Sequence, residues 1–494
     1  MSISVYNSLS RQKETFESII PGYVGVYVCG PTVYGDPHLG HARSAIVFDI
    51  VHRYLKFLGN KVRFVRNVTD VGHLENDADD GEDKIAKKAR LEQIEPMEVA
   101  HYYTLRYRKY MDELNCLSPS IEPQATGHIM EQIDVVKEIL AEGLAYEING
   151  SVYFDVTTYS KKNNYGELSG KVLEDLMAGS RTLDGQDEKK SPVDFALWKK
   201  ATDQHIMKWE SPWSVGYPGW HLECTAMSTK YLGKQFDIHG GGMDLQFPHH
   251  EAEIAQSRAA HKQQPAKYWL HNNMLTINGQ KMSKSLGNFI TLEDLFSGNH
   301  EILEQAYDTM TVRFFVLQAH YRSTVDFSNS ALQAAEKGYK KLSAATKFIK
   351  ETDFKGKGES AGEWDKKIEQ HIGLLSDFMN DDFNTARTLA SMFELSSVIF
   401  NMETGLVKQG DVMGESINKL RESFVGFFEE VLGFKVVEGA DGGALDNAMN
   451  VLIRLRNQAR LDKNFQLSDI IRDELAAEGI LLKDGKDGTS FEIK

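Results

Sequence analysis

The sequence predicts an α/β fold with a parallel sheet, followed by a helical bundle and a small mixed C-terminal domain. Residues 23–28 alternate as a strand does, and residues 42–51 have the apolar spacing of a helix. A strand, a loop and the start of a helix in this order are typical of α/β folds. Helical periodicity dominates from about residue 330 to 434, and a compact terminal unit follows.

The composition limits the class of protein. With 494 residues, 41% hydrophobic and 26% charged, the chain should form more than one packed domain. The N-terminus, MSISVYN, is unlike a leader peptide, and no apolar run approaches the length of a membrane span. Three cysteines exclude a disulfide framework and favour a reducing compartment. We therefore expect a soluble cytoplasmic protein with no membrane partner.

The net charge of −15 is unusual for a protein that binds nucleic acid, because Lys and Arg supply most of that affinity. Acidic surface elsewhere can nevertheless confine binding to a few basic faces. Two basic stretches consist of Lys337, Lys340, Lys341, Lys347 and Lys350, and of Arg454, Arg456, Arg460 and Lys463. Each could equally be a solvated helix face, which is the usual meaning of a charge run.

Two histidines lie where the first helix is expected to begin, in the motif His38-Leu39-Gly40-His41. The start of a helix after a strand is where α/β folds bind phosphate. Histidines at i and i+3 share one face of the first turn, and Gly40 leaves the backbone open to a ring such as adenine. The alternative is a pair of ordinary surface histidines, since a short motif often matches by chance.

A second motif, KMSKS at residues 281–285, follows a turn signal at Asn278-Gly279. A short hairpin is therefore expected to lead into a loop rich in Lys and Ser. The ammonium groups of Lys281 and Lys284 could close over a leaving pyrophosphate on such a loop. A solvated basic loop is the alternative, although five matching residues are difficult to obtain by chance.

Residues from three separate segments could form a zinc site with four ligands. Cys29 ends the first strand, Cys224 lies in PGWHLECTAMS, and His249 and Glu253 have the i, i+4 spacing that places both on one side of a helix. Buried structural cysteines and a surface His/Glu pair are the alternatives. Spacing alone favours those alternatives, because no CxxC pair is present.

The motifs HLGH and KMSKS, in this order, resemble the two signatures of class I aminoacyl-tRNA synthetases, which activate an amino acid with ATP and transfer it to tRNA. Within that class the chain resembles the cysteinyl-tRNA synthetase family. The similar segments keep the family's order: CGPTVY at 29–34, NVTD at 67–70, DFALWK at 194–199, PGWH at 218–221, DIHGGG at 237–242 and FPHHE at 247–251. The resemblance continues from Asp381 into the C-terminal tail and covers nearly the whole chain.

The resemblance implies that L-cysteine and ATP, with Mg²⁺, form cysteinyl-adenylate, and that cysteine then passes to the terminal ribose of tRNA(Cys). The catalytic groups would be His38, His41, Lys281 and Lys284, which stabilise phosphate charge. The ATP and adenylate site would contain Gly40, Gly242, Asp244 and Lys284, although Asp244 could instead cap a helix. The substrate site would contain Gly30, Thr69 and Trp220, although Trp220 could instead be a core aromatic.

In that family the residues matching Cys29, Cys224, His249 and Glu253 hold one zinc ion per chain, and the substrate thiolate binds the metal. His250 is the rival of His249 by proximity. A pocket that sorts by size would separate cysteine from serine by only about 1–3 kcal/mol. A thiol, with a pKa of about 8.5, loses its proton to a metal far more readily than an alcohol does. No editing domain is then expected.

The resemblance also implies a domain order with a Rossmann-type catalytic domain at the start. We expect its first half at residues 1–127, an inserted lobe at 128–200, its second half with the zinc site at 201–270, the KMSKS loop and stem-contact region at 271–330, a helical tRNA-binding bundle at 331–437 and an anticodon-binding domain at 444–494. A Gly/Asp-rich linker at 438–443 separates the last two. The expected partners are tRNA(Cys), L-cysteine and ATP, and the expected oligomeric state is a monomer.

Phe465 and Phe491 depart from the family, which typically has tryptophan at both positions. Base stacking there would therefore use phenylalanine. Two other functions fit part of the pattern. A ligase that joins activated cysteine to an amino sugar shares both motifs and the zinc residues, but the long tail after residue 330 argues against it. An inactive paralogue kept as an RNA-binding module has no physical reason to retain both motifs and the full ligand set.

Overall fold

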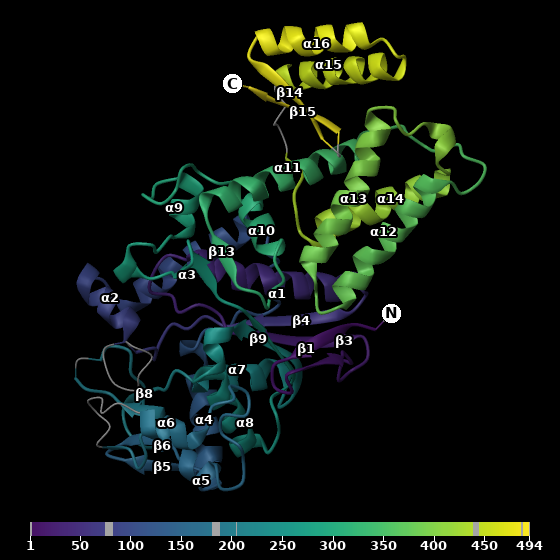
Figure 1. Cartoon of the computed structure of the whole chain (residues 1–494). Coiled ribbons are helices and arrows are strands. Elements are labelled where there is room, and N and C mark those ends of the chain that lie inside the picture. The colour runs from purple at the N-terminus through teal and green to yellow at the C-terminus, as the bar shows by residue number, and fades with distance from the viewer. Residues whose placement is uncertain are drawn as a thin grey trace. The chain divides into compact units, whose positions relative to one another are not determined.

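The computed structural model of the chain describes residues 2–74, 83–179, 188–203, 205–437, 444–485 and 488–493. It divides into two compact units (Figure 1). Unit 1 comprises Met1–Lys337, Ser376–Leu389 and Glu429–Phe434, and unit 2 comprises Gly338–Leu375, Ala390–Phe428 and Lys435–Lys494. Among the described residues, the helices are all too short or too polar to cross a membrane.

A parallel sheet of four strands organises unit 1, and it confirms the predicted fold class. Its order is β10-β9-β3-β4. The strands are β3 (Tyr23–Val28), β4 (Lys61–Arg66), β9 (Phe236–Gly242) and β10 (Ala266–Asn272). Val26 of β3 lies in register with Phe64 of β4 on one side and with Ile238 of β9 on the other. The strands β4 and β9 therefore lie on opposite sides of β3. A reversal of strand order of this kind opens a crevice at the carboxyl ends of the strands.

Helices connect the parallel strands. Helix α1 (Leu39–Phe57) joins β3 to β4, and α8 (His249–His261) joins β9 to β10. The helix α7 (Leu222–Leu232) precedes β9. A Cβ atom at Gly240 would lie 2.2 Å from the ring of Phe48, so this glycine allows α1 to pack closely on β9.

The segment between β4 and β9 contains a second sheet, which is antiparallel. Its order is β5-β6-β7-β8, and its strands are β5 (Ala145–Ile148), β6 (Ser151–Phe154), β7 (Phe195–Lys200) and β8 (Gly216–Pro218). Asn149 and Gly150 have positive φ and form the turn between β5 and β6. Val152 and Phe154 of β6 and Phe195 and Leu197 of β7 share one core with α4 (Ile129–Ala141), α7 and α8.

The remaining elements of unit 1 surround these two sheets. Strands β1 (Ser4–Asn7) and β2 (Gln12–Thr15) pair antiparallel, and the helices are α2 (Lys84–Glu92), α3 (Pro96–Glu113), α5 (Val156–Tyr159), α6 (Leu173–Gly179), α9 (Leu292–Ser297) and α10 (Thr309–Leu317). Strands β11 (Leu275–Ile277) and β12 (Gln280–Lys281) form the hairpin predicted before the KMSKS loop. Asn278 and Gly279 have positive φ at its turn. Strand β13 (Val325–Phe327) pairs with β11.

Segments from far along the chain complete unit 1. Asp382, between two long helices, accepts hydrogen bonds from the Tyr6 backbone N–H at 2.8 Å and from the Tyr321 hydroxyl at 2.7 Å. The Tyr54 hydroxyl of α1 donates to the Asn380 side chain at 2.9 Å. The contiguous part of unit 1, residues 1–337, is therefore held together partly by residues that follow it in sequence.

A buried ion cluster anchors the last of these segments. Arg313 of α10 is fully buried, and its Nε donates to the carbonyl of Leu432 at 2.7 Å. It also forms an ion pair with Asp49 of α1, which Arg53 contacts at 2.7 Å. Burial raises the pKa of Asp49, but the two guanidinium groups outweigh burial and hold that pKa below its usual value.

Helices dominate the rest of the chain, as predicted. The long helices are α11 (Asn329–Glu351), α12 (Glu363–Asn380), α13 (Thr385–Glu403) and α14 (Gly414–Val425), followed by a π-helical segment at Gly426–Val431. The terminal residues form the predicted small mixed domain, which contains α15 (Ala444–Leu461), α16 (Phe465–Ala477) and an antiparallel pair, β14 (Ile480–Gly485) and β15 (Gly488–Ile493). The linker predicted at residues 438–443 lies outside the described residues.

Candidate active site

A cavity of about 440 Å³ lies where the four parallel strands of unit 1 end. Its walls include residues at or just beyond the end of each strand: Cys29 after β3, Asn67 after β4, Gly242 at the end of β9 and Asn273 after β10. The carboxyl ends of parallel strands, where the strand order reverses, are the usual ligand site of such sheets. The cavity brings together all the predicted site residues except Lys284, Glu253 and the loop beyond Met282.

His38 and His41 form the amino-terminal end of α1. The Nδ1 atom of His38 accepts a hydrogen bond from the Gly40 backbone at 3.1 Å, and the Nδ1 atom of His41 accepts one from the His38 backbone at 3.2 Å. The two rings stack with centroids 3.8 Å apart. Because an acceptor nitrogen carries no proton, each neutral ring must carry its proton on Nε2. Burial lowers the pKa of His41 to about 4, so this ring is neutral near pH 7.

Gly40 is crowded by the ring of His38. A Cβ atom at Gly40 would lie 3.0 Å from His38 Cε1 and 3.8 Å from Met282 Cε. The prediction was that Gly40 opens the backbone to adenine. The structure adds a second reason for glycine here, since a side chain would push against the ring that caps the helix.

The KMSKS loop approaches the same part of the cavity. Lys281 is exposed, and both Lys281 and Met282 line the cavity wall. The side chain of Asn288 closes the loop, because it accepts from the Ser283 N–H at 2.7 Å and donates to the Lys281 carbonyl at 3.0 Å. The backbone of Lys284 begins a 3-10 turn, Lys284–Leu286, but the side chain of Lys284 lies outside the described part of the structure.

The predicted adenylate residues after β9 lie at the cavity wall. Gly242 and Asp244 both line it, and Asp244 is exposed. A Cβ atom at Gly242 would lie 2.3 Å from an Asp244 carboxylate oxygen, so glycine allows that carboxylate to turn back toward the end of the strand. Asp244 lies inside the 3-10 turn Met243–Gln246, whose N-cap residue is Gly242. Asp244 is therefore not the cap of this turn.

The predicted substrate residues lie together at another wall. The Gly30 backbone N–H donates to the Asn67 side chain at 2.9 Å, and a Cβ atom at Gly30 would lie 1.6 Å from the Asn67 carbonyl oxygen, which excludes any other residue. Trp220 lines the cavity, stacks on His73 with centroids 3.8 Å apart and lies 4.7 Å from the ring of His249. Trp220 thus both packs against its neighbours and faces the cavity.

The four predicted zinc ligands converge behind this wall, with their ligand atoms all within 4.8 Å of one another. The Sγ atom of Cys29 lies 3.6 Å from Sγ of Cys224 and 3.7 Å from Oε1 of Glu253. The Nε2 atom of His249 lies 3.4 Å from Sγ of Cys224 and 3.4 Å from Oε1 of Glu253. Tetrahedral zinc with ordinary bond lengths separates its ligand atoms by about 3.3–3.8 Å. These residues therefore fit zinc, by their chemistry and by their spacing.

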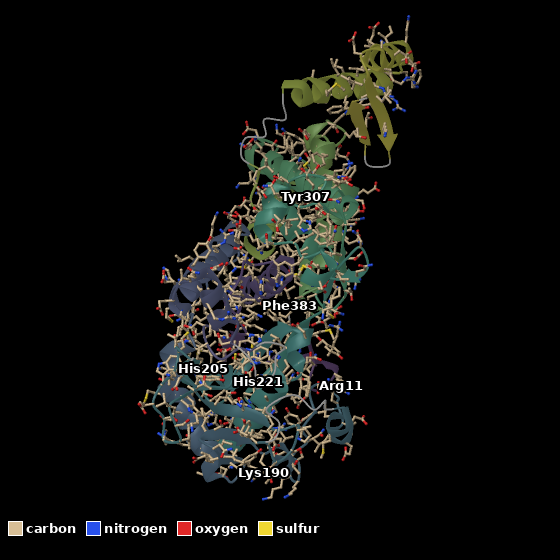
Figure 2. All side chains as sticks on the ribbon, turned by 90° about the vertical axis from the view of Figure 1, so that its left-hand side faces the viewer. Arg11, Lys190, His205, His221, Tyr307 and Phe383 are labelled. Carbon is tan, nitrogen blue, oxygen red and sulfur yellow. The ribbon has the colours of Figure 1, made fainter. Side chains whose placement is uncertain are left out.

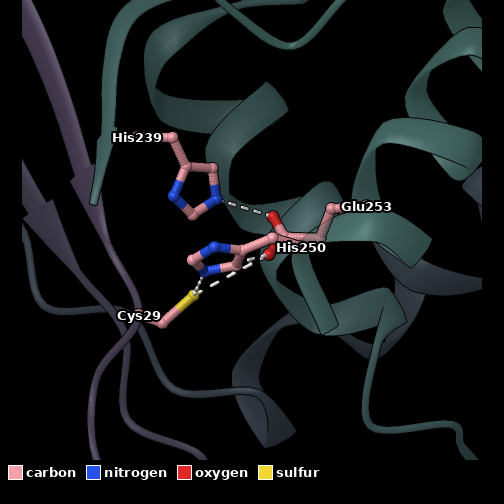
Figure 3. Close-up of side chains that lie close together, drawn as sticks. All are labelled: Cys29, His239, His250 and Glu253. Carbon is pink, nitrogen blue, oxygen red and sulfur yellow. Dashed lines mark hydrogen bonds and ion pairs between the residues drawn. The ribbon is translucent and has the colours of Figure 1, made fainter. Parts of the chain in front are cut away.

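A second set of residues overlaps the first, and Figure 3 shows it: Cys29, His239, His250 and Glu253. The Nε2 atom of His250 lies 3.3 Å from Sγ of Cys29. His239, however, contacts the other oxygen of Glu253 at 2.8 Å, which is a hydrogen-bond distance rather than the separation of two zinc ligands. Because both sets use Cys29 and Glu253, they describe one site. The spacing favours His249 as its histidine.

Buried histidines contact the two histidines that are candidate zinc ligands, His249 and His250. The Nδ1 atoms of His221 and His249 lie 3.1 Å apart, and His221 is buried at the position labelled in Figure 2. His250 contacts His271 at 2.8 Å through its other ring nitrogen. Such outer contacts fix the orientation of metal-binding histidines. Burial also raises the pKa of the Cys224 thiol to about 12 without a cation nearby, so a bound metal would have to displace that proton.

Sequence reasoning missed Glu223 and Asn67, although Asn67 lies in a segment that it compared with the family and Glu223 is the residue before the predicted ligand Cys224. The Asn67 amide donates to the Thr69 hydroxyl at 3.2 Å, and Thr69 donates to Oε1 of Glu223. Glu223 is 2% exposed, and burial raises its pKa well above the usual value. Polar residues just after a strand, such as Asn67 and Thr69 after β4, could have been a signal, but only the folded unit brings them into contact with Glu223 in the first turn of α7.

The chain matches two family models. Residues 15–337 match the catalytic domain of the class I (C) tRNA synthetases, and residues 376–436 match the DALR domain.

Curated relatives match over the full length. The chain is 54% identical to the cysteine-tRNA ligase of Porphyromonas gingivalis, and the alignment covers 99% of both chains. It is 55% identical to that of Cytophaga hutchinsonii, covering 99% of this chain and 98% of the relative. It is 46% identical to that of Deinococcus radiodurans, covering 99% and 97%.

Solved structures share the fold. The methionyl-tRNA synthetase of Mycobacterium tuberculosis, in complex with methionyl-adenylate, superposes with a TM-score of 0.59 at 14% identity, covering 83% of this chain and 89% of that one. A LeuRS–tRNA–LeuAMS ternary complex from Agrobacterium radiobacter gives 0.60 at 11% identity, covering 84% and 85%.

Proposed function

The chain belongs to the cysteine-tRNA ligases, a family of class I aminoacyl-tRNA synthetases, and we propose that it selects its substrate with zinc held by Cys29, Cys224, His249 and Glu253. The enzyme joins L-cysteine to tRNA with ATP. The spacing of the four ligand atoms carries the zinc proposal. Zinc, when bound, would favour the thiolate form of the substrate side chain and so discriminate against serine.

In the first step the cysteine carboxylate attacks the α-phosphorus of ATP, and pyrophosphate leaves. The Nε2–H groups of His38 and His41 act as donors to the phosphates, because their Nδ1 atoms are already acceptors at the start of α1. Lys281 and Lys284 add positive charge from the KMSKS loop, and Mg²⁺ arrives with ATP. Gly40, Gly242 and Asp244 shape the site for the nucleotide.

In the second step a hydroxyl of the terminal ribose of tRNA attacks the carbonyl carbon of cysteinyl-adenylate, and AMP leaves. The terminal domain is the proposed anticodon reader. Phe465 is 62% exposed at the start of α16, and Arg454, Arg460 and Lys463 are exposed nearby in sequence. Arg456, which the sequence placed in the same basic stretch, is buried at 4% and does not contribute to this surface.

Metal analysis tests the zinc proposal. Purified enzyme should contain one zinc ion per chain, and Cys224→Ser should lower both zinc content and affinity for cysteine. His249→Ala should empty the site, and His250→Ala is its matched control. A fully active enzyme without zinc would contradict the proposal, whereas loss of zinc only in His250→Ala would correct the ligand assignment.

Truncation at about residue 440 tests the role of the tail. Cysteine-dependent exchange of pyrophosphate into ATP should remain nearly intact, because the proposed adenylate-forming residues lie in unit 1. Transfer to tRNA should fall steeply and depend less on salt, because phosphate and base contacts are lost. Unchanged charging of tRNA by the truncated enzyme would exclude an anticodon-reading role and would reopen the question of another acceptor, such as an amino sugar.

A further inference from the structure

Glu223 has a carboxylate oxygen that no described group satisfies. The residue lies in the first turn of α7, is 2% exposed and lines the active-site cavity. Its Oε1 atom accepts hydrogen bonds from the Thr69 hydroxyl and, at 3.4 Å, from the Asn67 amide. Its Oε2 atom has no hydrogen-bond partner among the described residues. Buried polar atoms in folded proteins are nearly always satisfied, so this oxygen calls for a ligand.

The other acidic side chains that line the cavity are either satisfied by protein groups or exposed to solvent. Among the described residues, the carboxylates in its lining are Asp49, Glu223 and Asp244. Asp49 accepts from Arg53 and from the Leu117 backbone N–H, both at 2.7 Å, and pairs with Arg313. Asp244 is exposed beyond the end of β9. Glu223 alone of the three combines burial with an unsatisfied oxygen.

The position of Glu223 matches the part of cysteine that still lacks a partner. Cysteine has three polar groups: a thiol, a carboxylate and an α-ammonium group. In the proposed function the thiol meets the metal site, which contains the next residue, Cys224, and the carboxylate faces the phosphates near His38 and His41. The ammonium group then needs an acceptor near the thiol end of the cavity, and a carboxylate makes the strongest hydrogen bond to a cation.

We propose that Glu223 is a specificity-determining residue whose Oε2 atom accepts a hydrogen bond from the α-ammonium group of the substrate, while Thr69 holds its Oε1 atom in place. This assignment rests on the proposed function of the cavity. It implies that the enzyme tests its substrate twice at this end, once for the thiol and once for the amine. Thiols without an α-amino group should therefore bind more weakly than cysteine does.

The competing explanation is that Glu223 only supports the residues of the metal site and does not contact the substrate. Asn67, which contacts Glu223, has its side-chain oxygen 3.7 Å from Sγ of Cys224. A purely structural Glu223 would then affect every ligand that enters through its thiol. The substitution Glu223→Gln preserves size and the oxygen that Thr69 contacts, so it removes the charge with little change in packing.

The test compares three ligands in the full-length enzyme. Glu223→Gln should raise the KM for cysteine in pyrophosphate exchange by about 30- to 1,000-fold, as loss of one partner of a buried charge pair does. Cysteamine, which has the thiol and the amine, should lose competitive inhibition by a similar factor. Inhibition by 3-mercaptopropionate, which has the thiol and the carboxylate but no amine, should change by less than about threefold. Zinc content should be unchanged.

Asp70→Asn is the matched control, because Asp70 is also buried and lies near Glu223 but outside the cavity lining, where it accepts from the Thr126 N–H at 2.9 Å. It should leave the KM for cysteine unchanged. Equal losses for cysteamine and 3-mercaptopropionate in Glu223→Gln, or no loss for either, would overturn the assignment. If the wild-type enzyme itself showed no cysteine-dependent exchange, the proposed function would fail instead.

Discussion

The two ends of the active-site cavity are built in different ways. At the thiol end, Cys224, His249 and Glu253 are at most 1% exposed, and Cys29 is partly buried beside them. At the phosphate end, His38 and His41 are only partly buried and Lys281 is exposed. The proposed zinc ligands are buried and their ligand atoms lie at separations that fit zinc, whereas the proposed phosphate donors lie on a helix end and on a hairpin-linked loop.

The difference follows from the task of each end. Discrimination between a thiol and a hydroxyl depends on a rigid, desolvated site. In such a site a buried polar group that meets the wrong substrate stays unsatisfied, because the protein cannot move to satisfy it. Phosphate charge develops during the reaction, and groups that close around it can come from a loop. Variants at the thiol end should therefore alter cysteine binding, and variants at the phosphate end should alter the rate of adenylate formation.

The largest effect should come from the phosphate end. Lys284→Ala should slow adenylate formation by about 10²- to 10³-fold, the typical cost of one charge-stabilising donor, while leaving cysteine binding nearly unchanged. Lys281→Ala, on the same loop, should slow it less. Stopped-flow measurement of adenylate formation gives both numbers. A wild-type rate for Lys284→Ala would show that the loop does not reach the reacting phosphates.

A smaller effect is expected behind the thiol end. His221→Ala removes the contact to His249 and should weaken zinc affinity by about 10- to 100-fold, as loss of an outer-shell partner does. The KM for ATP should stay constant. Competition with a zinc chelator measures the affinity, and His221→Gln, which retains a hydrogen-bonding group, should recover part of it. An equal change in the KM for ATP would mean that the two ends are not separable.

The smallest effect concerns pH. The pKa of His41 is lowered to about 4, so its ring should not titrate between pH 8 and 5. Over that range the neutral ring should remain a hydrogen-bond donor to phosphate through its Nε2–H group. Because the folded pKa lies below that of the unfolded chain, protonation favours unfolding, and stability is lost as the pH falls from about 6.5 toward 4. Histidine NMR, assigned with His41→Gln, reports the midpoint directly. A midpoint near 6.5 would show that its surroundings do not lower the pKa of His41.

The sequence predicted elements best where the signal is local. The strand expected at residues 23–28 has those bounds, and the hairpin before KMSKS follows its Asn-Gly turn. The first helix is longer than the predicted 42–51, because His38 caps it and the helix begins at Leu39. Apolar spacing marks the buried face of a helix, but the cap fixes where the helix starts.

The site was predictable only in part. The spacing of the cysteine, histidine and glutamate residues along the sequence did not by itself predict a metal site. The resemblance to the family supplied the ligand set, and the structure brings these four residues together. Glu223 was missed, because its role depends on contacts with Thr69 and Asn67, which follow β4 more than 150 residues earlier in the chain. The buried Arg456 was misplaced, although residues at i and i+2 do not share a helix face, so Arg454 and Arg456 could not both have faced outward. The predicted domain boundaries stay predictions.

The discontinuous make-up of unit 1 has a consequence during synthesis. Residues 376–389 and 429–434 belong to the unit that contains the active site, through Asp382, Asn380 and the Leu432 carbonyl, to which the buried Arg313 donates. A nascent chain cannot complete these contacts until residue 434 has left the ribosome tunnel, so most of the polypeptide must be translated before the active site is fully supported. A fragment that ends at residue 337 would lack this support.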